Sequence, residues 1–144
     1  VLVGTRLSPA WRFDAAASYA SHRYEQWISG STDNSGKNIE SAPRTLANLR
    51  LSGQMVAGLN AQLEWVHVGS YNLDQANQFG KYPGHGLWNL RMSMALGADA
   101  SLFLRAMNVA DKRYADSASQ SNAAGGLYAP GLPRTVYAGI QARW

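Results

Sequence analysis

The residues with the most evident chemistry are ring-bearing side chains in long polar segments of the sequence. Aromatic rings offer stacking surfaces and lysines attract anions, so such segments are candidates for binding an anionic, aromatic ligand. A histidine close to a tyrosine is also a pair that can coordinate haem iron, as His85 and Tyr82 are placed to do. The candidates are Trp27, Tyr71, Phe79, Tyr82, His85 and Tyr128, accompanied by Lys37 and Lys81.

No constellation for catalysis or for a resident metal is found. The three histidines, His22, His67 and His85, lie in different segments without the His-Glu-x-x-His spacing, and there is no nucleophile elbow. The absence of cysteine excludes disulfides, cysteine zinc sites and thiol catalysis. Basic residues are scattered and the net charge is only +4, which argues against a nucleic-acid partner. We therefore expect a protein that is not an enzyme and carries no cofactor.

The elements that position these residues show apolar and polar side chains in alternation. Residues 88–96 are the clearest case, and residues 134–144 repeat the pattern up to the terminal Trp144. A period of two indicates half-buried β-strands. We count about seven such strands of roughly the ten residues that a tilted membrane strand needs. The pattern blurs at His67, and in residues 101–109 Phe103 shares a face with Arg105.

The connections between these strands alternate strictly in length. Short turns at 8–10, 56–58 and 97–100 are separated by long polar segments at 28–43, 72–85 and 115–133. In an antiparallel up-and-down meander, all short turns then lie at one end and all long loops at the other. Bacterial outer-membrane barrels have this layout, with short periplasmic turns and long extracellular loops. The polar rows carry arginines, which suit a hydrated lumen: Arg12, Arg50, Arg91, Arg105 and Arg143.

Aromatic residues near the strand ends suggest the two interfacial girdles of such a barrel. At the short-turn end we expect Trp11, Phe13, Trp88 and Trp144. At the long-loop end we expect Tyr24, Trp27, Trp65 and Tyr71.

Two C-terminal stretches carry a family resemblance. "LFLRAMNVADKRYAD" contains an Asn, Asp and Tyr at intervals of three, and "YAPGLPRTVYAGIQARW" contains a Gly-x-Pro-Arg turn before a last strand that ends on an aromatic residue. They resemble the C-terminal end of TonB-dependent outer-membrane receptors, as do "GTRLSPAWRFDAAASYASHRYE" and "SAPRTLANLRLSG" upstream. The matching positions are Asn108, Asp111, Tyr114, Gly131, Pro133, Arg134 and Trp144.

The resemblance implies an all-β fold in which these strands are the C-terminal part of a large transmembrane β-barrel. Barrels of this family have about 22 strands and a lumen plugged by an N-terminal domain. Seven strands cannot close such a barrel. We therefore expect residues 1–144 to be one segment of the barrel, with the plug domain and the remaining strands outside this sequence.

The resemblance also implies a function and its partners. We expect a receptor in the outer membrane of a Gram-negative bacterium for the energy-coupled uptake of an iron-siderophore complex. Its partners would be outer-membrane lipid, the TonB energising complex through the missing plug segment, and the barrel assembly machinery, which would read Trp144. Asn108 and Asp111 are expected to be turn residues that bond local backbone, and Tyr114 an interfacial aromatic.

Three alternatives stay open. The first is a haem or cobalamin receptor of the same family. The second is a small autonomous outer-membrane barrel that acts as a pore or anchor, for which an extra strand within residues 111–133 would supply the even strand number. The third is a soluble β-sandwich binding module, in which a second sheet covers the apolar rows.

Overall fold

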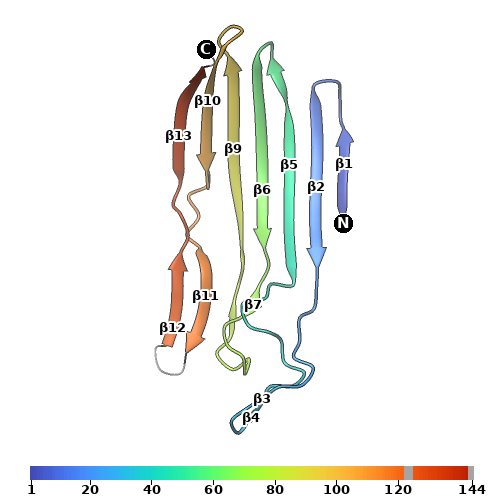
Figure 1. Cartoon of the computed structure of the whole chain (residues 1–144), viewed down its shortest axis with the longest axis vertical. Coiled ribbons are helices and arrows are strands. Elements are labelled where there is room, and N and C mark those ends of the chain that lie inside the picture. Colours follow the sequence, from blue (N-terminus) through green and yellow to red (C-terminus); the bar gives the residue numbers. More distant parts are fainter. Residues whose placement is uncertain (122–124, 143–144) are drawn as a thin grey trace.

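The computed structural model of the protein describes residues 1–121 and 125–142, and its main feature is one seven-stranded sheet. Neighbouring strands of this sheet are antiparallel, and they follow one another in chain order. This confirms the predicted meander (Figure 1). Arg143 and Trp144 lie outside the described residues. In spatial order the strands are β1 (Leu2–Arg6), β2 (Trp11–Tyr19), β5 (Thr45–Val56), β6 (Leu59–Val68), β9 (His85–Ala95), β10 (Ala100–Met107) and β13 (Thr135–Ala142).

The long connections fold into hairpins of their own, which the sequence did not predict. These are β3 (Ile28–Ser29) with β4 (Thr32–Asp33), β7 (Tyr71–Asn72) with β8 (Lys81–Tyr82), and β11 (Ala115–Ser121) with β12 (Gly125–Pro130). All three lie at one end of the main sheet and the short turns at the other, as the connection lengths predicted (Figure 1). The β11–β12 hairpin is a separate two-stranded sheet, so the strand count of the main sheet remains seven. Within the described ranges, no helix is long and apolar enough to cross a membrane.

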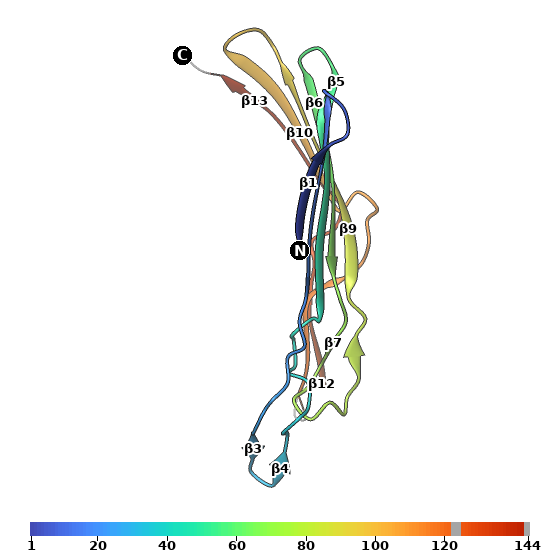
Figure 2. The ribbon, with the colours of Figure 1, turned by 90° about the vertical axis from the view of Figure 1, so that its right-hand side faces the viewer.

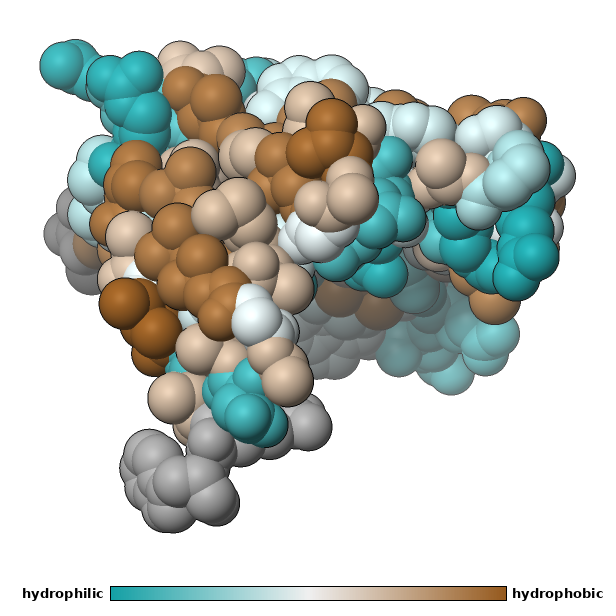
Figure 3. Space-filling view, turned by 90° about the horizontal axis from the view of Figure 1, so that it is seen from above, coloured by the Kyte–Doolittle hydropathy of each residue, from teal (hydrophilic) through white to brown (hydrophobic). Residues whose placement is uncertain are grey.

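The register of the strands separates the sheet into a polar and an apolar face. Across β2, β5 and β6, Asp14 pairs with Arg50 and Arg50 with Glu64, while one position away Phe13 pairs with Leu51 and Leu51 with Leu63. Because directly paired residues point to the same side, each face collects one kind of side chain. Figure 3, seen from the short-turn end, shows hydrophobic and hydrophilic side chains gathered in different areas.

Within residues 1–121 and 125–142, no second layer covers the apolar face. Figure 2 shows the main sheet as a single curved layer. Large apolar side chains on this face are accordingly exposed, for example Leu63 at 40% and Ile140 at 69%. The buried hydrophobic residues of the described ranges lie instead in the loop hairpins: Tyr71, Leu73, Tyr82, Ala115 and Ala118. The alternative of a β-sandwich, with a second sheet over the apolar rows, is therefore not formed by the residues that the structure describes.

The two ambiguous positions of the sequence are resolved by the register. Phe103 does share the polar face with Arg105, whose guanidinium carbon lies 5.7 Å from the centroid of the Phe103 ring. His67 lies on the apolar face, where its ring stacks on that of Trp65 at a centroid distance of 5.3 Å. Each exception to the alternation, Phe103 on the polar face and His67 on the apolar face, is thus in contact with a side chain two residues away on the same strand.

The expected position of Trp88 in the short-turn girdle was wrong. Trp88 lies near the start of β9, which is the end that follows a long connection. It pairs directly with Trp65, and the two rings lie 6.3 Å apart between centroids. Trp11 does begin β2 directly after a short turn, as expected.

Several glycines leave room for an aromatic ring from the neighbouring strand. Gly53 faces Trp11 across β5 and β2, and a Cβ atom there would lie 2.6 Å from Cδ2 of the indole. Gly139 faces Phe103 across β13 and β10, where the corresponding distance to the ring is 2.7 Å. A bare glycine covered by a cross-strand ring helps to fix strand register.

Replacement of Gly53 by alanine is therefore expected to destabilise the complete barrel. The added methyl group would overpack against Trp11 and the backbone of Ala10, at a cost of about 1–3 kcal/mol in the free energy of unfolding. Urea unfolding in lipid vesicles measures this. Ser52→Ala, at the next position on the polar face, is the matched control and should change the free energy by less than about 0.5 kcal/mol. Equal stabilities of the two variants would contradict the role assigned to Gly53.

Candidate functional site

The long-loop end of the sheet contains a buried cluster of rings that includes three of the predicted ligand residues. The hydroxyl of Tyr82 lies 3.0 Å from Nδ1 of His85, donates to the carbonyl of Ala115 at 3.0 Å and accepts from the Ala115 amide at 3.1 Å. The hydroxyl of Tyr71 accepts from the amide of Ala118 at 2.9 Å. The two tyrosine rings pack against each other at 5.2 Å between centroids. Tyrosine hydroxyls of the second long loop therefore hold strand β11 of the third.

The first long loop is fastened to the second by the side chain of Asn77 and by a hydrogen bond from the Ser41 amide to the Asn72 carbonyl at 3.1 Å. The side chain of Asn77 donates to the carbonyl of Asn38 at 2.8 Å and accepts from its amide at 2.9 Å. Asn77 has a positive φ of 57°, a conformation that asparagine tolerates better than most residues. Together with the tyrosine hydroxyls, this makes the three loops one connected body.

The six predicted ligand residues differ in how accessible their rings are to a ligand. Tyr71, Tyr82 and His85 are buried and bonded to protein groups, so their present partners are parts of the fold. Trp27 packs on Tyr24 with a centroid distance of 4.4 Å. Phe79 and Tyr128 remain 47% and 59% exposed, which leaves their rings available to a ligand.

Tyr24 anchors its loop through a partly buried hydroxyl. This hydroxyl donates to Oε2 of Glu40 at 2.6 Å. Burial, followed by the hydrogen bond to the Glu40 carboxylate, raises the pKa of Tyr24 to about 12. The phenol is therefore protonated, and it remains a donor to Glu40 throughout the physiological pH range.

Two of the larger hollows of the described residues lie among the loops, and they differ in charge. The first, of about 480 Å³, has residues of all three loops in its wall, among them Phe79, Asn34, Glu40, Asp74 and Gln120, and no lysine or arginine lines it. The second, of about 670 Å³, combines aromatic and cationic residues and is named the cationic loop hollow here. It is lined by Tyr82, Pro83, Gly84, Lys112, Arg113, Tyr114, Ala115, Tyr128 and Pro130.

The cationic loop hollow has the chemistry expected for an anionic, aromatic ligand, but its charges come from residues that the sequence interpretation did not choose. Lys112 and Arg113 lie inside the Asn-x-x-Asp-x-x-Tyr motif, which was the available signal. The chosen lysines lie elsewhere: Lys37 Nζ donates to Asn34 Oδ1 at 3.2 Å, and Lys81 lines a small separate pocket.

The same motif organises the end of β10. Nδ2 of Asn108 donates to the carbonyls of Lys112 at 2.9 Å and Leu132 at 3.1 Å, and Oδ1 accepts from the Lys112 amide at 2.9 Å. Oδ1 of Asp111 accepts from the amide of Arg134 at 2.9 Å. Both motif residues have positive φ angles, 49° and 50°. Only the bonds between Asn108 and Lys112 are local, as expected for a turn residue. The bonds to Leu132 and Arg134 span 24 and 23 residues, so both side chains also fasten the end of β10 to the segment before β13.

Tyr114 and Gly131 complete this arrangement. The Gly131 amide donates to the Tyr114 carbonyl at 2.9 Å, and the Tyr114 ring covers Gly131 so closely that no Cβ atom would fit. The ring also lies 4.5 Å from that of His85. Tyr114 therefore packs within the loop body. Pro133 and Arg134 lie directly before β13, with the Arg134 amide on Asp111, and Trp144 lies outside the described residues.

A polar network on the polar face connects this turn to the sheet. Glu64 accepts hydrogen bonds from Asn48 at 3.0 Å, Arg50 at 3.2 Å and Asn89 at 3.2 Å. Asn89 Oδ1 in turn accepts from the amide of Asn108 at 3.0 Å. The chain of contacts runs across β5, β6 and β9 to the end of β10. Sequence reasoning missed it, since only strand register brings these residues together.

Comparisons with known proteins agree with this architecture. Residues 2–109 match the family described as TonB dependent receptor-like, beta-barrel. The curated proteins contain no match to the sequence.

Several solved structures have a similar fold. The siderophore receptor PiuA from Acinetobacter baumannii has a TM-score of 0.78 and 15% identity, over 98% of this chain and 20% of that chain. The ferric yersiniabactin uptake receptor FyuA from Yersinia pestis has a TM-score of 0.76 and 15% identity, over 98% and 22%. The copper transporter OprC has a TM-score of 0.69 and 20% identity, over 96% and 22%. The likeness shows the fold alone, and the chain spans about a fifth of the length of these proteins.

Replacement of Asn108 by alanine is expected to destabilise the complete barrel by roughly 2–4 kcal/mol, because three hydrogen bonds of its buried side chain are lost. The left-handed backbone adds to this cost, so Asn108→Gly should be about 1 kcal/mol less destabilising than Asn108→Ala. Urea unfolding measures both. Lys112→Ala is the control, because only the backbone of Lys112 bonds Asn108. A wild-type midpoint for Asn108→Ala would refute the structural role.

Proposed function

Because the chain belongs to the family of TonB-dependent receptor-like β-barrels, we propose that residues 1–144 form the C-terminal part of a transmembrane receptor barrel that takes up a ferric siderophore. A family of receptors and transporters also fits the predicted absence of enzymatic activity. The plug domain and the remaining strands would lie outside this sequence.

The observation that carries the proposal is the uncovered apolar face of the main sheet. Strands with one apolar and one polar face are stable where lipid contacts the first and a hydrated lumen the second. Exposed leucine, isoleucine and valine side chains on strands β6, β10 and β13 would otherwise contact water. The sorted turns and loops then orient the sheet, with the short turns in the periplasm and the hairpins outside the cell.

The edges of the sheet support the same interpretation. In the described ranges, β1 pairs only with β2, and β13 only with β10. An unpaired strand edge exposes backbone donors and acceptors, which lipid cannot satisfy. Strands from the rest of a larger barrel would pair with both edges.

For the ligand, the cationic loop hollow supports a ferric siderophore. Lys112 and Arg113 would attract an anionic iron chelate, and the exposed ring of Tyr128 would stack on its aromatic groups. The haem alternative has less support, because Tyr82 and His85 are buried and hydrogen-bonded. Two of the similar structures are of proteins named as siderophore receptors or uptake receptors.

The remaining partners follow from this proposal. Outer-membrane lipid of a Gram-negative bacterium would contact the apolar face. The TonB energising complex would act through the plug segment, and the barrel assembly machinery would bind the last strand. In transport, the loops would capture the chelate before energised movement of the plug releases it to the periplasm.

The encoding gene provides the first test. We expect the reading frame to continue upstream of the Val1 codon for several hundred codons and to encode a signal peptide, a plug domain and more alternating strands. A start codon and signal peptide directly before Val1 would instead favour a small autonomous barrel and refute the transporter proposal.

Ligand capture is tested by the double variant Tyr128→Ala/Arg113→Gln in the full-length gene product. Loss of one stacking surface and one cation is expected to raise the Kd for a ferric siderophore roughly tenfold. Binding and uptake of radioactive iron siderophores by cells measure this. Tyr128→Phe/Arg113→Lys keeps both the ring and the charge, and should bind like the wild type. Unchanged affinity of the first variant would exclude the cationic loop hollow as the site.

A further inference from the structure

A small polar pocket lies where the first and second long loops meet, and is named the junction pocket. It has a volume of about 80 Å³, and its wall contains basic side chains of both loops but no aspartate or glutamate. The first loop contributes His22, Asn38, Ala42 and Arg44, and the second contributes Ser70, Tyr71, Asn72 and Lys81.

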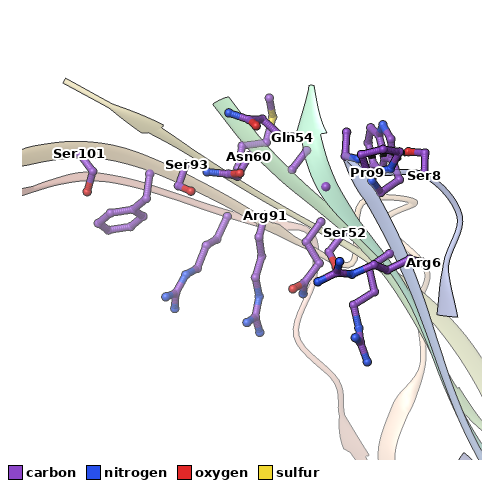
Figure 4. Close-up of a pocket in the computed structure, with 18 of the residues that line it drawn as sticks. Arg6, Ser8, Pro9, Ser52, Gln54, Asn60, Arg91, Ser93 and Ser101 are labelled. Carbon is purple, nitrogen blue, oxygen red and sulfur yellow. Dashed lines mark hydrogen bonds between the residues drawn. The ribbon is translucent and has the colours of Figure 1, made fainter. Parts of the chain in front are cut away.

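The size of the junction pocket distinguishes it from the large hollow on the polar face of the sheet. That hollow has a volume of about 770 Å³ and spreads over seven strands near the short turns. Figure 4 shows Arg6 and Arg91 of its wall extending from the same side of the sheet. The junction pocket has room for only a few water molecules, so its ligand must be a single small group.

Hydrogen bonds between the loops hold the wall of the junction pocket in place. Oδ1 of Asn38 accepts from the guanidinium of Arg44 at 2.6 Å, and the Asn38 amide donates to Oδ1 of Asn77 at 2.9 Å. The same oxygen of Asn77 accepts from Nδ2 of Asn72 at 3.1 Å. The two loops therefore present their side chains to the pocket in a defined arrangement.

The charges of the junction pocket are not compensated by the residues that the structure describes. Both salt bridges found there lie on the main sheet, away from this pocket. Arg44 uses one of its five N–H donors on Asn38. Within residues 1–121 and 125–142, the side chains of Lys81 and His22 form no hydrogen bond or ion pair. Two cations and several free donors therefore surround one small space.

Donors that come from two loops suit a tetrahedral oxyanion better than a carboxylate. A phosphate group has at least three strong acceptor oxygens directed to different sides, whereas the two oxygens of a carboxylate lie in one plane. The planar guanidinium of Arg44 can bind two phosphate oxygens, and Lys81 acts as a point charge. The Ser70 hydroxyl and the His22 ring can donate to the other oxygens.

We propose that the junction pocket binds a phosphate group, with Arg44 and Lys81 as its charged ligands, and that the bound group fastens the first long loop to the second. Arg44 belongs to one loop and Lys81 to the other, so a shared anion compensates a cation of each. The site is independent of the transported ligand, because it shares no residue with the cationic loop hollow.

The phosphate group has two possible sources, a free anion or a lipid headgroup. The pocket lies at the level where strands of the main sheet end, since His22 follows β2, Arg44 directly precedes β5 and Ser70 follows β6. With the apolar face of the sheet in a membrane, lipid headgroups lie at this level. Both sources offer the same chemistry to Arg44 and Lys81, and separate arms of one experiment distinguish them.

Phosphate binding to the purified full-length gene product tests the proposal. Calorimetry in micelles of a phosphate-free maltoside detergent measures the Kd for inorganic phosphate in one arm and for phosphatidic acid, added to the same micelles, in the other. We expect saturable binding in at least one arm. Arg44→Gln/Lys81→Gln should raise that Kd roughly tenfold, because two charge-assisted contacts are lost. Binding of inorganic phosphate identifies a free anion, and binding of phosphatidic acid alone identifies a lipid headgroup.

Matched variants and a second measurement complete the test. Lys37→Gln removes a charge of the same loop outside the pocket wall and should leave the Kd unchanged. Arg44→Lys/Lys81→Arg keeps both charges and should retain most of the affinity. Phosphate at about ten times its Kd should slow proteolysis of the first two loops roughly tenfold in the wild type, but not in Arg44→Gln/Lys81→Gln. Heat-modifiable migration on gels confirms that each variant is folded.

Absence of saturable binding in both arms would overturn the site, as would equal affinities of the wild type and Arg44→Gln/Lys81→Gln. Binding that leaves proteolysis of both loops unchanged would refute the proposed connection between them. These measurements require neither a siderophore nor transport, so their failure is distinguishable from a failure of the proposed function.

Discussion

The structure depends on one constraint: neighbouring strands satisfy the backbone of the inner long strands, while nothing among the described residues covers the large apolar side chains of the apolar face. Antiparallel pairing uses the donors and acceptors of β2, β5, β6, β9 and β10 on both sides. The sheet is a single layer, so its hydrophobic rows stay exposed at Leu63, Val136 and Ile140. Water is a poor solvent for such a surface and lipid a good one, which makes the environment part of the fold.

The loops are stabilised differently from the sheet, because they lie beyond it and depend on contacts with one another. Their buried cluster is small and contains tyrosines, whose hydroxyls bond backbone groups of a neighbouring loop. One tyrosine thus supplies both apolar area and hydrogen bonds that an irregular backbone needs. The same contacts limit which rings can meet a ligand, since a ring that holds loops together is buried.

The sequence predicted most of the sheet and less of the site, for a physical reason. The alternation of apolar and polar residues is a local pattern, so it located seven strands and the two faces of the sheet. The lengths of the connections placed the short turns at one end of the sheet and the long loops at the other. The contacts of Glu64 with Asn48, Arg50 and Asn89 join three strands, and only register determines them. The Tyr82 hydroxyl bonds Ala115, which is 33 residues away. Trp88 was assigned to the wrong end, although the long connection directly before β9 already indicated the correct one.

The polar face shows how one surface can have two roles along its length. Near the loops, Glu64 accepts hydrogen bonds from Asn48, Arg50 and Asn89, and the network continues to the turn at Asn108, although Nε of Arg50 is buried without a partner. Near the short turns, Arg6 faces Arg12 and Arg91 faces Arg105, and among the described residues only Arg12 has a salt bridge to an acid. A network whose groups are mostly paired gives rigidity, whereas like charges that face each other without an acid cost stability. The half of the polar face near the loops therefore stiffens the sheet, whereas the half near the short turns concentrates positive charge.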